Sequence, residues 1–454
     1  MTRTDTNFAA NGTDDLLLPE DEPAPLRNLF LASQHVLAMF GATVLGPLLM
    51  GFDPNTAILF SGIATLIFTA VLWRKVPSYL GSSFSFIAAV NLATGFSGQP
   101  GTGNPRLAIA LGGIVAAGAL YFLIGFIVSR VGYRWLERLM PPVVTGAIVG
   151  VIGLNLAPVA VKEIGGSPLD TAFGLLTMAL VVFIAVVFSQ RAKRGTRNLK
   201  LADIVGFIGK VPILIGGGIA YGLYWLACNV SAMGPRIDFT RLHAAPWLGL
   251  PTITVPQWDQ RAIVVIAPVA FVLVAENFGH IRAIGAMTHR NLDPYLGRAF
   301  MADGASTILS GLLGGTGVTT YAENMGVMSL TRNFSTYTLF FAGIIAICLG
   351  LSPKFGEAIK TIPTAIIGGL SFILFGLITA TAARIWSEAK PAVDFSEARN
   401  LLVVGITLVV GAGNLTWQFG SFAFGGIASA TFTAVILYHV IARARAPVAP
   451  LMLS

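Results

Sequence analysis

Apolar runs recur along almost the whole chain, separated by short stretches rich in glycine, proline and charged residues. Each run holds about 18–25 residues, enough for a helix to cross about 30 Å of hydrocarbon. We therefore predict an all-α polytopic membrane protein with about fourteen transmembrane spans. The predicted spans lie near residues 29–51, 54–73, 79–96, 106–129, 139–160, 172–190, 204–230, 261–283, 297–313, 316–331, 335–352, 361–383, 398–413 and 421–441.

Composition and charge agree with this class and orient the chain. Hydrophobic residues make up 55% of the sequence and charged residues 11%, whereas a soluble domain carries about 25% charged residues. With a cytosolic N-terminus, about 18 Lys and Arg fall in inside loops and about 7 in outside loops, as the positive-inside rule requires. We expect both termini to be cytosolic, and we attribute the net charge of +8 to these loops rather than to a nucleic-acid site.

The third and tenth predicted spans do not begin like membrane helices. Their starts read VPSYLGSSFSFIAAV (76–90) and GGTGVTTYAENMGVM (314–328), and Gly and β-branched residues favour extended backbone. Such backbone is tolerated at membrane depth only inside protein or beside a water-filled cavity, so we predict short strands breaking spans 3 and 10 near a midplane site. Because the interruptions lie seven spans apart, we predict a 7+7 inverted repeat.

Two carboxylates lie in sequence that otherwise predicts membrane interior, Glu276 in PVAFVLVAENFGH and Glu323 in GGTGVTTYAENMGVM. A charge at this depth costs about 2.5–3.5 kcal/mol on insertion scales, and such residues usually face a cavity and bind a substrate or ion. His280 lies four residues after Glu276 and shares its helix face. We hypothesise that one proton, shared among Glu276, His280 and Glu323, binds together with the substrate.

Each of these residues also has a purely structural interpretation. Glu323 can be a helix-start carboxylate attracted to the helix dipole, and His280 a satisfied core histidine. We interpret His35 as structural, with its hydrogen bonds inside the first span. Asp303 either tunes the proton site or bonds another span, and Arg282 is interpreted as a topology anchor at the cytosolic end of span eight.

The remaining polar features point to no further site. Residues 1–26 and 446–454 are interpreted as cytosolic tails, the first of them disordered, and the basic run QRAKRGTRNLK (190–200) as a loop that meets anionic lipid. Cys228 and Cys348 are isolated in apolar segments. Because no Cys, His and carboxylate cluster has metal-ligand spacing, we expect no metal and no cofactor besides the coupling proton.

Four motifs, taken in order, resemble one family of transporters. They are QHVLAMFGATVLGP (34–47), VPSYLGSSFSF (76–86), AENFGH (275–280) and TTYAENMGVMSLTR (319–332). On these motifs the chain resembles the nucleobase–ascorbate transporter (nucleobase:cation symporter) family from about residue 27 to 445. ERLMPPVVTGA (137–147) and HRNLDPYLGRAF (289–300) are similar to the bacterial uracil permeases, and among these to the Rut-type pyrimidine permease.

The resemblance implies a core domain and a gate domain, and proton-coupled import of uracil, with thymine or related pyrimidines as further substrates. It also implies an elevator-like alternating-access movement, a homodimer, and residence in the bacterial inner membrane. The implied segments are 27–133 (core, spans 1–4), 134–254 (gate, spans 5–7), 255–352 (core, spans 8–11) and 353–445 (gate, spans 12–14).

The resemblance also implies the contacts to the base. Glu276 and Glu323 would accept hydrogen bonds from the ring nitrogens, and the backbone at Phe84 and at Tyr321–Ala322 would approach the carbonyl groups. Ala42 and the ring of Tyr321 would line the plane of the base. Where the uracil permeases carry a tyrosine facing the base, the matching position is Phe375, which makes tolerance of thymine more plausible.

Three alternative functions remain open at this point. A purine (xanthine or urate) proton symporter would share the fold, although purine-type relatives commonly have glutamine where Glu323 stands. An anion transporter or channel of the sulfate-permease fold usually adds a soluble C-terminal domain, and only about a dozen residues follow the last span. A membrane enzyme would need a nucleophile–base pair, metal cluster or cofactor motif, and none is evident.

Overall fold

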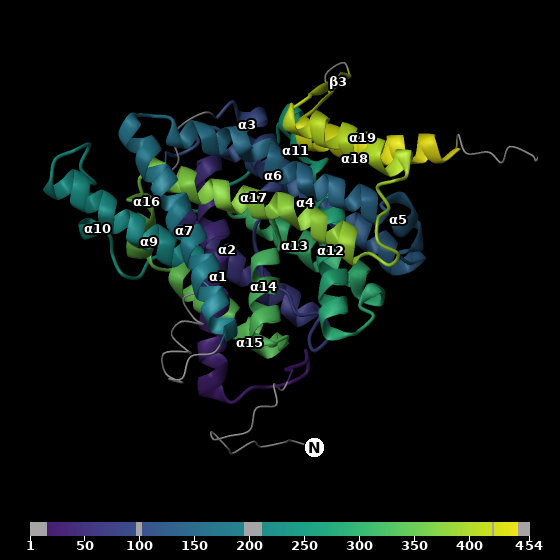
Figure 1. The fold of residues 1–454 in the computed structure, drawn as a ribbon, viewed down its shortest axis with the longest axis horizontal. Coiled ribbons are helices and arrows are strands. Elements are labelled where there is room, and N and C mark those ends of the chain that lie inside the picture. Colours follow the sequence, from purple (N-terminus) through teal and green to yellow (C-terminus); the bar gives the residue numbers. More distant parts are fainter. Residues whose placement is uncertain (1–15, 97–101, 195–210, 420–421, 444–454) are drawn as a thin grey trace, which may run out of the picture.

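The computed structural model describes residues 16–96, 102–194, 211–419 and 422–443 as an assembly of packed helices with two small hairpins (Figure 1). The start of the N-terminal tail, most of the basic run, the start of the seventh span and the C-terminal tail lie outside these ranges. The first half contains α1 (Pro25–Met50), α2 (Pro54–Val71), β1 (Leu80–Ser82), α3 (Ser85–Thr94), α4 (Leu107–Val131), α5 (Arg134–Leu139), α6 (Pro142–Ile164), α7 (Pro168–Arg194), α9 (Pro212–Trp225), η1 (Leu226–Val230) and α10 (Thr240–Ala244). The second half contains α11 (Gln260–Ile266), α12 (Val269–Thr288), η2 (Asp293–Tyr295), α13 (Leu296–Leu312), β2 (Val318–Thr320), α14 (Ala322–Thr331), α15 (Thr336–Gly350), α16 (Pro353–Lys360), α17 (Thr364–Glu388), α18 (Ala398–Ala412), β3 (Trp417–Phe419), β4 (Phe422–Phe424) and α19 (Gly426–Arg443).

Long apolar helices make this a multi-pass membrane protein. Within the described ranges, eight helices are long and apolar enough to cross a membrane, with α11 and α12 counted as one. The pair α15 and α16, bent by 79°, gives a ninth, and α3, α18 and most of α19 are shorter apolar helices. The total of fourteen spans stays a prediction.

The two halves repeat one order of elements. In the first, α1, α2, β1, α3 and α4 are followed by the short helix α5; in the second, α12, α13, β2, α14 and α15 are followed by the short helix α16. Strand β1 pairs with β2 antiparallel, with Gly81 opposite Thr319. Short strands therefore occur in both segments whose composition favoured extended backbone, and they pair with each other. That they break membrane spans stays a prediction.

Threonines at matching places in the two halves satisfy the backbone of these strands. Thr65 on α2 accepts a hydrogen bond from the Leu80 N–H at 3.0 Å and donates one to the Leu80 carbonyl at 3.3 Å. Thr307 on α13 does the same for Val318, at 3.2 and 3.3 Å. Backbone groups buried away from water need such partners, so the threonines explain how strands this short persist in the interior.

Helix packing divides most of the chain into two groups. In the first, α4 packs along α13 and α2 along α15, with α1 and α11 beside them. In the second, α6 packs along α17 and α18 along α19, and α7 lies against α9 and α17; α6 and α17 run side by side in Figure 1. Helix α12 contacts members of both groups. The assignment of these groups to core and gate domains stays a prediction.

The prediction of a disordered tail is wrong for the part of it that follows residue 16. The Leu17 N–H donates to the Arg332 carbonyl at 2.9 Å, and the Phe334 N–H donates to the Leu17 carbonyl at 2.8 Å. Glu20 accepts two hydrogen bonds from the Arg290 guanidinium, at 2.8 and 2.5 Å. The polar composition of the segment predicted disorder. Its binding partners lie about 270 residues or more away in the sequence, so the composition of the segment itself gives no sign of them.

Replacing Glu20 by glutamine is expected to loosen residues 17–22. The hydrogen-bonded Arg290 holds the pKa of Glu20 below its usual 4.5, so the ion pair is present at neutral pH and is lost as the pH falls through that lowered pKa. Because the pair is partly exposed, amide hydrogen exchange of this segment should become about two- to fivefold faster at pH 7. Glu22→Gln is the matched control, because Glu22 lies 3.8 Å from Arg74 with both side chains about half exposed. Equal exchange in both variants would show that backbone hydrogen bonds alone hold the segment.

Candidate functional site

The two strands bring the first residues of two short helices to the same helix, α12. Ser85, the first residue of α3 after β1, donates a hydrogen bond to Glu276 on α12 at 3.4 Å. Thr320, the last residue of β2, contacts His280 Nδ1 on α12 at 2.9 Å. Glu323 on the first turn of α14 is close enough to Glu276 for the two carboxylates to interact electrostatically. The structure therefore brings together Glu276, His280 and Glu323.

A buried polar network continues from His280 into the first helix group. The Asn277 amide nitrogen donates to Tyr121 Oη at 2.7 Å and to Asp303 at 2.6 Å. The Thr320 hydroxyl donates to the Asn277 side-chain oxygen. Asp303 therefore bonds another helix, one of the two roles considered for it, and its second carboxylate oxygen has no partner among the described residues.

This network determines which nitrogen of His280 carries a proton. A threonine hydroxyl has one hydrogen, and that of Thr320 is donated to Asn277. Thr320 can therefore only accept from His280 at Nδ1, which must be protonated. Nε2 is left to gain or lose the second proton, and His280 lines the large cavity described below.

The ring of Tyr321 is wedged between α1 and β1. Its hydroxyl donates to the Ser82 carbonyl at 2.9 Å and accepts from Thr43 on α1 at 3.1 Å. A Cβ atom at Gly81 would lie 2.4 Å from the ring, so only glycine permits this approach. Ala42, predicted to line the plane of a bound base, is fully buried on α1 next to Thr43.

The backbone groups predicted to approach the substrate differ in availability. The Tyr321 N–H is donated to the Tyr79 carbonyl at 3.0 Å, so it is already occupied. For the N–H groups of Phe84 and Ala322, the described residues provide no hydrogen-bond partner. Ala322 is the first residue of α14 and Phe84 directly precedes α3, where helix N–H groups are free to bind an acceptor.

Two phenylalanines from the two helix groups meet beside this region. Phe84 and Phe375 on α17 pack edge to face, with ring centroids 5.7 Å apart and an angle of 89° between the planes. Phe375 is 2% exposed, and its ring offers no hydroxyl at the position where the family resemblance implies a tyrosine in the uracil permeases.

The prediction that His35 forms its hydrogen bonds inside the first span is wrong. The Asn324 side chain on α14 donates to the His35 carbonyl at 3.0 Å and contacts His35 Nδ1 at 3.2 Å. His35 therefore links two helices rather than bonding within the first one. The Ser and Thr residues at the starts of the interrupted spans, Ser85 and Thr320 among them, were the signal by which sequence reasoning could have found the partners of Glu276 and His280.

A cavity of about 1270 Å³ lies between α12 and α14 on one side and α6, α17 and α19 on the other. Ala322, Glu323 and His280 line it, whereas Glu276, Phe84, Tyr321, Ala42 and Phe375 are not among its lining residues. The other lining residues include Arg290, Arg384 and Lys390, which belong to loops and helix ends predicted to be cytosolic. The cavity therefore leads from that side of the protein to the carboxylate of Glu323.

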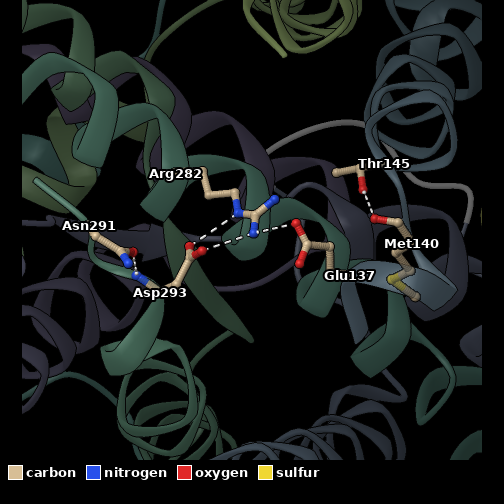
Figure 2. A network of polar contacts seen from close by, with 6 residues as sticks. All are labelled: Glu137, Met140, Thr145, Arg282, Asn291 and Asp293. Carbon is tan, nitrogen blue, oxygen red and sulfur yellow. Dashed lines mark hydrogen bonds and ion pairs between the residues drawn. The ribbon is translucent and has the colours of Figure 1, made fainter. Parts of the chain in front are cut away.

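Arg282 is more than the topology anchor that its position predicted. It donates to both carboxylate oxygens of Asp293, at 3.1 and 2.9 Å, and to Glu137 on α5 at 2.9 Å (Figure 2). All three residues line the cavity.

Metal sites in proteins are built from acidic, histidine and cysteine side chains. The described residues contain no group of three or more His, Cys, Asp or Glu that could hold an ion.

Comparison with known proteins extends over nearly the whole chain. A permease family model, Xan_ur_permease, matches residues 26–420. The chain is 48% identical over 442 residues to the putative pyrimidine permease RutG of Escherichia coli (strain K12), covering 97% of this chain and 96% of that protein. It is 37% identical to the uracil permease of the same strain, over 91% of each chain. Identity to the Bacillus subtilis (strain 168) uracil permease is 33%, covering 94% and 95%.

Solved structures show the same fold in more distant proteins. The transmembrane domain of the cyanobacterial bicarbonate transporter BicA matches with a TM-score of 0.61 at 14% identity, covering 90% of this chain and 96% of that one. The murine anion transporter Slc26a9, in its inward-facing state, matches with 0.65 at 11% identity, covering 96% and 73%. These similarities concern the fold alone, whereas the family model and the sequence relatives span nearly the full length. The chain therefore belongs to the nucleobase–ascorbate transporter family of permeases.

Proposed function

We propose that this protein imports uracil and related pyrimidines as a proton-coupled secondary transporter. The observation that carries the proposal is the meeting of Glu276, His280 and Glu323, of which His280 and Glu323 line a cavity between α12 and α14 on one side and α6 and α17 on the other. The names of its relatives, a putative pyrimidine permease and several uracil permeases, support a pyrimidine as the substrate.

The donors and acceptors of this site match those of a uracil ring. Uracil has two N–H donors and two carbonyl acceptors, and an unpaired polar edge costs about 1–3 kcal/mol when buried. Glu276 and Glu323 supply acceptors for the two donors. The free N–H groups of Phe84 and Ala322 supply donors for the carbonyls. Thymine has the same donors and acceptors and adds one methyl group, and Phe375 presents only carbon atoms to a base beside it.

Proton coupling follows from the same side chains. Glu276 and Glu323 repel each other when both are charged, and His280 offers Nε2 as a further proton site. Binding of one proton removes a charge from a confined apolar region, where charge is costly. A proton bound together with the substrate then lets the proton gradient drive uptake, and we propose no other cofactor.

We further propose that the first helix group is a core that moves, elevator-like, against the second group, the gate. The repeated element order and the antiparallel β1–β2 pair support a 7+7 inverted repeat. Adding α13 and α14 to the apolar helices gives fourteen spans, with β1 and β2 breaking spans 3 and 10. The protein would lie in the bacterial inner membrane with cytosolic termini, as a homodimer.

Uptake of labelled uracil into proteoliposomes tests the function. An imposed inward proton gradient should drive accumulation, and both a protonophore and Glu323→Gln should abolish it. Thymine should compete with uracil, because it has the same hydrogen-bonding groups and Phe375 has no hydroxyl to crowd its added methyl group. Stronger competition by xanthine or urate than by uracil would replace the pyrimidine with a purine on the same fold. Conversion of uracil to a product in sealed vesicles would contradict transport itself.

A further inference from the structure

The ion pair between Glu137 and Arg282 joins helix α5 to helix α12, which contacts members of both helix groups. On one side, Arg282 is held in place by its own neighbours. It shares two hydrogen bonds with Asp293, at 3.1 and 2.9 Å, and its guanidinium lies 4.4 Å from the centre of the Phe278 ring. These three contacts hold the guanidinium against η2 and α12, and the bond to Glu137 is its contact with a different helix, α5.

On the other side, Glu137 is held by the group that contains α6 and α19. Met140 directly follows the last residue of α5, and its carbonyl accepts a hydrogen bond from Thr145 on α6 at 3.0 Å (Figure 2). His439 on α19 lies 3.3 Å from the Leu139 carbonyl. Helix α5 is thereby tied to α6 and α19 at its end, while Glu137 extends to Arg282 at 2.9 Å.

The pair lies at the cavity, where a relative movement of the two groups must change distances. Glu137 and Arg282 both line the cavity, and their side chains are 43% and 31% exposed. Because Arg282 is bonded to Asp293 in η2, which leads directly into α13 of the first group, a sliding movement of that group draws Arg282 away from Glu137. The ion pair breaks unless α5 moves too.

Helix α16, the second short helix of the repeated order, also carries an ion pair to another helix. Helix α16 occupies the place of α5 in the second half, and its Lys360 pairs with Asp53, the residue before α2, at 2.9 Å. A Cβ atom at Gly356 on α16 would lie 2.4 Å from the Asn55 side chain. Helix α16 therefore packs tightly on α2 of the first group, whereas Glu137 of α5 lines the cavity.

We propose that the Glu137–Arg282 ion pair is a latch that stabilises the state in which the cavity is open towards the cytosolic side. This proposal rests on the movement put forward under the proposed function. An interaction present in one state and absent from another shifts the population towards the first by its own free energy. Loss of the latch therefore depopulates the open state and slows access to Glu323 from the cytosol.

Thiol labelling measures this access without a substrate. The reporter is Ser329→Cys, an exposed residue of α14 that lines the cavity, in a background with Cys228→Ala and Cys348→Ala. In inside-out vesicles, a membrane-impermeant maleimide should label the reporter about two- to fivefold more slowly with Glu137→Gln, the range for a partly exposed pair. Glu137→Lys should slow labelling further, because it repels Arg282.

Glu388→Gln is the matched control. Glu388 also lines the cavity, but its partner Arg384 lies on the same helix, 3.4 Å away, so labelling should equal the parent rate. Raising the salt to about 1 M, where the Debye length is about 3 Å, should slow labelling of the parent and leave Glu137→Gln unchanged.

Unchanged labelling in Glu137→Gln, or an equal effect of Glu388→Gln, would overturn the latch. If Glu137→Gln fails to fold, the salt dependence of the parent still decides, because a flat response contradicts an electrostatic latch. Labelling is independent of what is transported. A parent that shows the latch but takes up no uracil would therefore refute the proposed substrate and leave the latch standing.

Discussion

A Glu276→Gln variant is expected to lose all accumulation of uracil against a gradient while it still exchanges uracil across the membrane. Glutamine keeps the length of the side chain and an oxygen that accepts the hydrogen bond from Ser85, seen at 3.4 Å, but it cannot bind and release a proton. Loss of the charge-assisted bond to the substrate should also weaken binding by about 1.4 kcal/mol, roughly tenfold. Concentrative uptake and counterflow in the same proteoliposomes separate the two effects.

The control for this variant is a carboxylate removed from the lining of the cavity that His280 and Glu323 share. Glu388→Gln takes a charge from the cavity lining without touching Glu276, Glu323 or His280, so coupling should persist. Accumulation that persists in Glu276→Gln would place the proton on Glu323 or His280 instead. Loss of both accumulation and counterflow would assign Glu276 to binding alone.

The residues of the candidate site could be singled out in the sequence because charge and backbone irregularity are both rare in apolar spans. Glu276 and Glu323 stood out for their charge, and the segments around Gly81 and Thr319 for their glycine and β-branched residues. Each signal is local, since it needs only the residue and its neighbours in sequence. The antiparallel pairing of β1 with β2 then places the two irregular segments side by side.

The Ser and Thr residues of the interrupted spans were a signal of polar partners, but which residue bonds which could not be predicted, because it depends on pairing between distant segments. Thr320 bonds His280 across 40 residues, and Glu137 reaches Arg282 across 145. Nothing near Arg282 in the sequence distinguishes a topology anchor from one partner of an ion pair between helix groups. The same holds for Glu20, whose acidic neighbourhood predicted disorder although Arg290 binds it.

Replacing Gly81 by alanine is expected to abolish transport and to lower the melting temperature by several degrees. The added Cβ atom would lie 2.4 Å from Cζ and 2.6 Å from Oη of Tyr321, far inside van der Waals contact. The ring has no free direction to move, because its hydroxyl is bonded to Ser82 and Thr43. Overpacking of this kind costs about 1–3 kcal/mol. Thermal unfolding in detergent and uracil uptake measure the two effects.

The expected loss of transport in Gly81→Ala follows from what is attached to Tyr321. Ala322 and Glu323 follow it directly at the start of α14, so a displaced ring carries with it a free N–H group and a carboxylate of the site. Gly405→Ala on α18 is the control, because a Cβ there meets nothing within 4 Å and alanine favours a helix by up to about 1 kcal/mol. Adding Tyr321→Leu to Gly81→Ala should restore stability but not uptake, because the clash is relieved while the ring is gone. Recovery of both would show that Tyr321 only fills space.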